Sequence, residues 1–133
     1  MDIEEVRKLF ANDRFATEAA GAVVDEVTDD TAVCSLDIAD IHKNAAGNVM
    51  GGVMFTLADF AFAVATNRSG CLVVTVSSTV EFIGSAKGTR LIATATPQKI
   101  GRSLCFYDIE VRDDLGNLVA MVTTVGKRTS VEI

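Results

Sequence analysis

Hydrophobic and polar positions alternate along the chain in patterns that predict helices at two places and strands elsewhere. Residues 3–10 carry apolar side chains at helical spacing, with acidic residues first and basic residues last, as a helix dipole favours. Residues 22–28 and 31–39 alternate as two short strands do, and the turn chemistry of Asp29-Asp30 between them predicts a hairpin.

The longest apolar run, residues 49–65, follows a polar loop over residues 40–48. The run is apolar on every side, so we expect a helix that is buried all round. It has 17 residues with two glycines and one carboxylate, whereas a membrane span needs about 20 apolar residues. The pattern therefore indicates a core helix and no membrane partner.

Beyond this helix the chain is strand-like over residues 71–83, 89–97, 102–112 and 118–125. Short turns between the last three strands predict an antiparallel meander. In the first strand, the apolar side chains expected on one face are Leu72, Val74, Val76, Val80 and Phe82. One sheet around one helix is an α+β architecture, and we expect a single domain over residues 1–133.

Charge narrows the possible partners. The formal net charge is −6, which argues against a nucleic-acid partner because such binding depends on Lys and Arg neutralising phosphates. The balance is uneven, however. Residues 1–66 are strongly acidic, whereas residues 67–133 carry six acids and eight bases. The second half could therefore hold a small phosphorylated ligand.

Three cysteines, Cys34, Cys71 and Cys105, are scattered without the spacing of a zinc site or a disulfide framework. Each has apolar neighbours, so we expect reduced, buried thiols. The first residues lack the basic start and apolar stretch of a signal peptide. A cytoplasmic protein is the resulting expectation.

Asp59 is the only ionisable residue in the predicted core helix. No Lys or Arg lies between residues 44 and 67 to pair with it along the helix. An unpaired carboxylate in an apolar interior is costly, so such groups shift their pKa, find hydrogen bonds or lie at a site. One alternative is a structural carboxylate that accepts local hydrogen bonds or reaches water at an interface. The other is a nucleophile or general base whose pKa is tuned by burial.

Gly51-Gly52 stands where this helix should begin. Free N–H groups in the first turn of a helix favour an anion or a developing oxyanion, while close packing against the sheet is the alternative reason for glycine. Gly51 and Asp59 are eight residues apart, or about 12 Å of continuous helix. Both groups can therefore reach one carbonyl only if they come from different subunits, which predicts an obligate twofold dimer.

The segment from Asn44 through Gly47, Gly51 and Gly52 to Asp59 resembles the PaaI-like branch of the hotdog acyl-CoA thioesterases. That branch has the pattern Asn-x-x-Gly-x-x-His-Gly-Gly followed by Leu-(Ala/Val)-Asp. The likeness continues at residues 82–88, at residues 99–102 and in the final strand, and so covers nearly the whole chain from residue 22. It implies a hotdog fold and the hydrolysis of an acyl-CoA. An aryl or medium-chain acyl group would suit Met50, Met54, Phe60 and Phe62, although these side chains equally suit a core.

The resemblance also implies residue roles. Asp59 would act as nucleophile or general base, and the Gly51 N–H would polarise the thioester carbonyl. Asn44 would help to place substrate or water, and Thr75 would position the attacking water. Coenzyme A would be held by Phe82, Ser85, Lys87, Lys99, Gly101, Arg102 and Lys127. No metal or further cofactor is expected, and the dimer would pair again into a tetramer.

Two alternatives stay open, each on its own observation. The family's His before Gly-Gly is Met50 here, so a non-catalytic acyl-CoA-binding protein is one alternative. The other is a hotdog enoyl-CoA hydratase, because Asp37 and His42 match the Asp-x4-His spacing of that group. A His in a polar loop is otherwise expected to be exposed and without a role.

Overall fold

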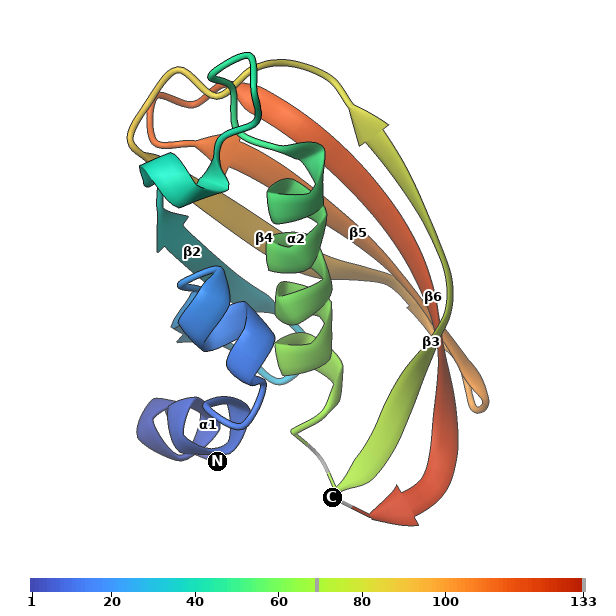
Figure 1. Ribbon diagram of the computed structural model, residues 1–133. Coiled ribbons are helices and arrows are strands. Elements are labelled where there is room, and N and C mark those ends of the chain that lie inside the picture. Colours follow the sequence, from blue (N-terminus) through green and yellow to red (C-terminus); the bar gives the residue numbers. More distant parts are fainter. Residues whose placement is uncertain (69, 133) are drawn as a thin grey trace.

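A curved antiparallel sheet wraps around helix α2 in the computed structural model, which describes residues 1–68 and 70–132 (Figure 1). The strand order is β1-β2-β4-β5-β6-β3. The strands are β1 (Val23–Val27), β2 (Ala32–Asp37), β3 (Cys71–Phe82), β4 (Arg90–Ile100), β5 (Leu104–Asp113) and β6 (Leu118–Glu132). The helical elements are α1 (Ile3–Phe10), the π-turn η1 (Phe15–Ala19), the 3₁₀ turn η2 (Asp40–His42) and α2 (Gly51–Thr66).

The predicted hairpin and meander are both present. β1 pairs with β2 across the Asp29-Asp30 turn, and β4, β5 and β6 follow one another as antiparallel neighbours. β3 comes before the meander in sequence but lies beyond it in space, where it pairs with β6. β3 is therefore an edge strand, and its outer side has no neighbour among the described strands.

The core lies between α2 and the concave face of the sheet. On β5 the buried side chains alternate as the sequence predicts, with Tyr107, Ile109 and Val111 facing the helix. From α2, Leu57, Ala61 and Val64 are fully buried against them. Burying such residues is the main contribution to stability, at roughly 25 cal/mol per Å² of apolar surface.

A β-bulge gives β3 different faces from those predicted. The register with β6 shifts between Thr75 and Ser77, and this one extra residue reverses which side chains of β3 face the core. Val73 is buried, whereas Val74 and Val76 are 42% and 60% exposed. The prediction that Val74 and Val76 share a core face was wrong, because sequence alternation alone does not reveal a bulge.

The prediction that the core helix is buried all round was also wrong. One side of α2 faces away from the sheet, with Gly52 and Asp59 exposed and Phe55, Thr56 and Ala63 half-buried. The sheet covers only the opposite side of α2, which packs against strands that include β4 and β5; in Figure 1 these strands lie behind the helix. In a single chain the sheet leaves this stripe of α2, including Asp59, uncovered.

Two local expectations also need correction. Cys34 and Cys105 are buried free thiols, but Cys71 is an exposed one at the start of β3. His42 is buried rather than exposed: its Nδ1 accepts a hydrogen bond from the Ala39 N–H (3.0 Å), so its Nε2–H donates to the Ala20 carbonyl (2.8 Å). Within residues 1–68 and 70–132, no helix has the length and apolarity needed to cross a bilayer.

Asp113 holds the β3–β4 loop against the β5–β6 turn. Asp113 is only 2% exposed. Its carboxylate accepts hydrogen bonds from the backbone N–H groups of Lys87, Gly88, Leu115 and Asn117. The Asn117 side chain donates another, at 2.9 Å. These bonds, that from the Asn117 side chain first, hold the pKa of Asp113 well below its usual range.

We expect Asp113→Asn to lower the melting temperature at neutral pH by several degrees, because a neutral amide oxygen accepts these bonds more weakly. The native carboxylate stabilises the fold above the ordinary Asp pKa, and this stabilisation is lost as pH falls towards the lowered value. The melting temperature of the variant should therefore depend less on acid. Asp108→Asn, on the outer face of β5, serves as the control, and equal melting temperatures for both variants would contradict the assignment.

Candidate active site

The amino end of α2 is open. Met50 precedes the first helical residue with extended backbone (ψ 141°), and no side chain among the described residues caps the helix. The first-turn N–H groups of Gly51 and Gly52 have no acceptor in residues 1–68 and 70–132. Such groups carry a partial positive charge, so this end can accept an anion or oxyanion.

Gly51 brings Phe82 to this helix end. A Cβ at residue 51 would come within 2.7 Å of the Phe82 ring, so only glycine lets the ring lie this close. Phe82 is the last residue of β3, and its side chain is 59% exposed. Two residues predicted for different roles, one for the oxyanion and one for coenzyme A, therefore lie in contact.

Asn44 shapes the loop that leads into α2. Its Oδ1 accepts hydrogen bonds from the N–H groups of Ala46 (3.0 Å) and Asn48 (3.1 Å). Gly47 completes the turn with a φ of 83°, which glycine adopts without strain. The side-chain oxygen of Asn44 thus holds the loop, and only the side-chain nitrogen is left for a substrate or water.

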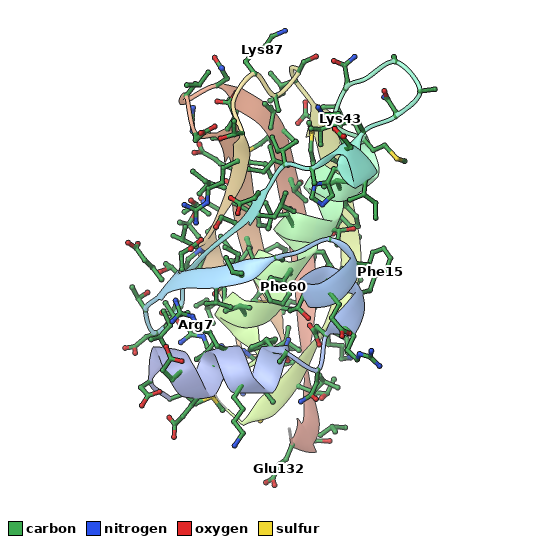
Figure 2. All side chains as sticks on the ribbon, turned by 60° about the vertical axis from the view of Figure 1, so that its left-hand side comes forward. Arg7, Phe15, Lys43, Phe60, Lys87 and Glu132 are labelled. Atoms are coloured by element: carbon green, nitrogen blue, oxygen red, sulfur yellow. The ribbon has the colours of Figure 1, made fainter. Side chains whose placement is uncertain are left out.

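Asp59 lines a cavity of about 360 Å³ on the open side of α2. The helix contributes Phe55, Thr56, Phe60 and Ala63, and the opposite wall is the segment of residues 13–16 at the start of η1. Figure 2 shows this segment beside α2, with Phe15 towards solvent and Phe60 towards the interior. The cavity is mostly apolar and aromatic, as a pocket for an acyl group requires.

The carboxylate of Asp59 has no hydrogen-bond or ion-pair partner among the described residues. Because Asp59 is exposed on the open side of α2, its unpaired carboxylate can face water or a substrate. Burial against the apolar wall raises the pKa of Asp59, and the negative charge of Asp13 raises it further. A raised pKa is typical of a carboxylate that acts as a base or nucleophile.

Gly51 and Asp59 lie on one uninterrupted helix, as expected. Their separation is therefore about 12 Å along the axis, too far for both to touch one carbonyl group. Thr75 and Asn44 are not among the described residues that line the Asp59 cavity. A single chain thus presents these predicted catalytic groups at separate places.

The predicted coenzyme A residues fall into two groups at opposite ends of the sheet. The loop group, Phe82, Ser85 and Lys87, lies beside the amino end of α2, where Figure 2 labels Lys87. The turn group, Lys99, Gly101, Arg102 and Lys127, surrounds the β4–β5 turn, where the Gly101 N–H donates to the Leu104 carbonyl and Lys127 pairs with Leu104. Between the groups runs the 11-residue β4, roughly 35 Å of extended chain.

The structure does not support Asp37 and His42 as the catalytic dyad of an enoyl-CoA hydratase. Both ring nitrogens of His42 are occupied by backbone groups, so neither is free for proton transfer. Asp37 is exposed at the end of β2, where its backbone lies opposite that of Arg90 on β4. His42 therefore holds the fold, joining η2 to the end of η1.

Sequence reasoning missed the second wall of the cavity. Asp13 and Phe15 line the cavity of Asp59 from a segment to which the sequence assigned no element. The Asn12-Asp13 pair after α1 is turn chemistry and could have indicated a reversal of the chain. It could not have shown which helix the returning segment packs against.

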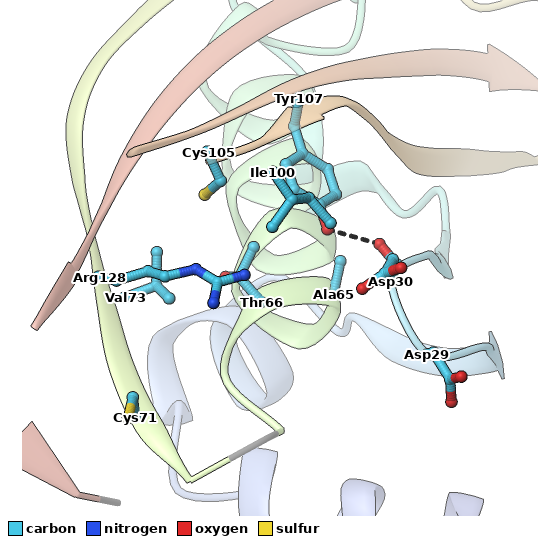
Figure 3. A pocket seen from close by; sticks show the side chains of 10 residues that line it. All are labelled: Asp29, Asp30, Ala65, Thr66, Cys71, Val73, Ile100, Cys105, Tyr107 and Arg128. Carbon is cyan, nitrogen blue, oxygen red and sulfur yellow. Dashed lines mark hydrogen bonds between the residues drawn. The ribbon is translucent and has the colours of Figure 1, made fainter. Parts of the chain in front are cut away.

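A second cavity lies at the other end of α2 (Figure 3). Its walls include Cys105, Arg128 and Tyr107, whose hydroxyl donates to the Asp30 carbonyl at 2.6 Å. Burial raises the pKa of Tyr107 to about 12, so this hydroxyl keeps its proton at neutral pH. With about 50 Å³ it is too narrow for an acyl chain, and it contains none of the predicted site residues.

Comparison with known proteins decides the family. Residues 46–120, which include α2 and the strands up to the start of β6, match the thioesterase superfamily. The chain belongs to this superfamily. Membership confirms the thioesterase predicted from the sequence.

The part of the chain that the structure describes contains no grouping of three or more His, Cys, Asp or Glu side chains for a metal ion.

Individual members of the thioesterase superfamily agree in sequence and fold. The acyl-coenzyme A thioesterase PaaI of Escherichia coli is 29% identical over 119 residues, 89% of this chain and 84% of that protein. The solved structure of E. coli PaaI superposes with a TM-score of 0.85 at 25% identity, over 99% of both chains. A Streptococcus pneumoniae thioesterase solved with coenzyme A superposes with a TM-score of 0.81 at 22% identity, over 90% and 96%. The hotdog fold and the PaaI-like resemblance are thereby confirmed.

Proposed function

We propose that this thioesterase hydrolyses an acyl-CoA, with Asp59 of one subunit and the Gly51 N–H of another acting on the same thioester. The observation that carries the proposal is the side of α2 that the sheet leaves open. An unpaired carboxylate lies there in an apolar cavity, on a helix whose amino end is uncapped. E. coli PaaI, similar over most of the chain, is an acyl-coenzyme A thioesterase.

The proposal requires a dimer, and the β3 edge offers the surface. β3 has 12 residues, an unpaired outer side and exposed apolar side chains at Val74 and Val76. Long apolar edges of this kind pair readily with another strand. Antiparallel pairing of two β3 strands across a twofold axis would also bring two α2 helices together, with Gly51 of one beside Asp59 of the other.

The same twofold would unite the coenzyme A residues. Antiparallel pairing sets the beginning of one β3 beside the end of the other, so the turn group of one subunit approaches the loop group of its partner. Lys99, Arg102 and Lys127 would then face Lys87 across the interface and neutralise the phosphates of coenzyme A. The S. pneumoniae structure with coenzyme A supports this ligand class for the fold.

The chemistry then follows from the two halves of the site. The acyl group enters the cavity beside Phe55 and Phe60, whose aromatic walls suit an aryl or medium-chain group. Asp59 either attacks the thioester carbon or removes a proton from a water that attacks it, with Thr75 and Asn44 placing that water. The carbonyl oxygen becomes an oxyanion at the Gly51 N–H, and the C–S bond breaks to release the acid and coenzyme A thiol.

The dimers would associate into tetramers, because the outer face of the sheet presents Phe106 and Leu104 to solvent. The protein would act in the cytoplasm, where Cys34, Cys71 and Cys105 stay reduced as free thiols.

A thiol-trapping assay over a panel of aryl- and aliphatic acyl-CoAs tests the function. We expect release of free coenzyme A, with the highest kcat/KM for aryl or medium-chain groups. Acyl-CoA binding without thiol release would replace the proposal by a binding protein, the alternative raised by Met50. Hydration of crotonyl-CoA, followed by loss of the enoyl absorbance, would support the hydratase instead.

A further inference from the structure

Asp13 shares the cavity of Asp59. It precedes η1, and its main chain is held from both sides. The Asp13 N–H donates to the Phe10 carbonyl (3.0 Å), and the Asp13 carbonyl accepts from the N–H (3.0 Å) and the hydroxyl (3.1 Å) of Thr17. The backbone of Asp13 is therefore fixed while its side chain lines the wall opposite Asp59.

The charge of Asp13 is not neutralised locally. The neighbouring cation, Arg14, pairs with Glu18 one turn along and is thereby occupied. Among the described residues the carboxylate of Asp13 has no ion pair and no hydrogen bond. Asp13 thus places an uncompensated negative charge in the cavity that holds the only carboxylate of α2.

We propose that Asp13 is a positioning residue that governs the proton occupancy of Asp59 and so sets the lower end of the pH range in which the enzyme works. The inference rests on the proposed function of Asp59. Two carboxylates in one apolar cavity disfavour the state in which both are charged. Asp13 therefore favours the protonated form of Asp59, so that Asp59 keeps its proton up to a higher pH than it would without Asp13.

The groups around Asp59 give this effect a definite sign. From the wall segment, Asp13 and Arg14 line the cavity, and Arg14 is paired with Glu18. The cavity-lining residues of α2 other than Asp59 are uncharged. The pKa of Asp59 is raised by burial first and by Asp13 second, and burial also raises the pKa of Asp13. Removing the charge of Asp13 leaves only the contribution of burial, so the pKa of Asp59 should fall.

The pH profile of Asp13→Asn tests the inference in the full-length protein. Asn has nearly the same shape as Asp, so we expect an intact fold and an acid limb of kcat/KM that moves to lower pH. Activity on that limb therefore rises relative to wild type, while the plateau changes little. A merely structural role for Asp13 would lower activity at every pH without moving the limb. Asp108→Asn removes the same charge from the outer face of β5 and should leave the limb in place.

A ¹³C carboxyl titration of Asp59 in wild type and in Asp13→Asn separates this inference from the function on which it rests. A lower titration midpoint together with a shifted limb supports the inference. If neither moves, the inference is overturned while the thioesterase proposal stands. If the midpoint moves but the acid limb does not, protonation of Asp59 does not limit turnover, which contradicts both the inference and the role of Asp59.

Discussion

Asp59→Asn is expected to lower kcat on the order of 10³-fold, because an amide can neither attack a thioester nor accept a proton from water. The substitution changes little else. Asn fills the same space on the open side of α2, and no hydrogen bond or ion pair among the described residues is lost. Thiol release from the best acyl-CoA measures the effect.

Stability gives this variant a second, opposite signature. The raised pKa of Asp59 means that the cavity disfavours its charged form, so the neutral amide should keep or raise the melting temperature at neutral pH. Coenzyme A should bind with unchanged affinity by calorimetry, since the basic groups are untouched. Near-normal turnover, or turnover lost only through unfolding, would remove Asp59 from the mechanism. Asp108→Asn is again the control and should retain wild-type kinetics.

Val76→Lys should yield a monomer and an inactive protein. Val76 is 60% exposed at the bulge of β3, and a lysine on an edge strand opposes pairing with a second strand. Without the partner, Asp59 keeps its cavity but loses the Gly51 N–H of the other subunit. Loss of one oxyanion donor costs roughly 10²-fold or more in kcat. Light scattering after gel filtration gives the mass, and the thiol assay gives the activity.

The opposite edge of the sheet supplies the matched control. Val23 on β1 is 51% exposed, so Val23→Lys introduces the same side chain at the edge that the proposal does not use. We expect this control to remain dimeric and active. A Val76→Lys monomer with wild-type activity would overturn the shared site, and a dimer that survives Val76→Lys would place the interface elsewhere.

Local sequence signals predicted most of the fold. The capping box of Asp2 and Glu5, with apolar residues at helical spacing, fixes α1 at residues 3–10 as expected. The alternation of β5 and the turns around it fix the meander. The bulge of β3 had no such signal, because the extra residue Val76 is as apolar as its neighbours. Its effect appears only in the pairing with β6.

The site was predictable where its chemistry departs from its surroundings. A lone acid and a glycine pair stand out in an apolar helix, and the structure places both on α2 as expected. The sequence could not show that Asp59 faces away from the sheet, since a helix apolar on all sides gives no preferred face. Nor could it show Asp13 as a neighbour, because contacts between residues 46 positions apart depend on how the chain turns after α1.

His42 gives the two halves of the site a common anchor. One side of the imidazole is bonded to the end of the segment that carries Asp13 and Phe15, and the His42 carbonyl accepts from the Met50 N–H (2.9 Å) just before Gly51. Under the proposed mechanism, a displacement of the wall beside the acyl group would reach, through His42, the helix end that binds the oxyanion in the same subunit. In a twofold assembly those two places serve different substrates, so a bulky acyl group in one site would alter the geometry of the other, and turnover at the paired sites would be interdependent.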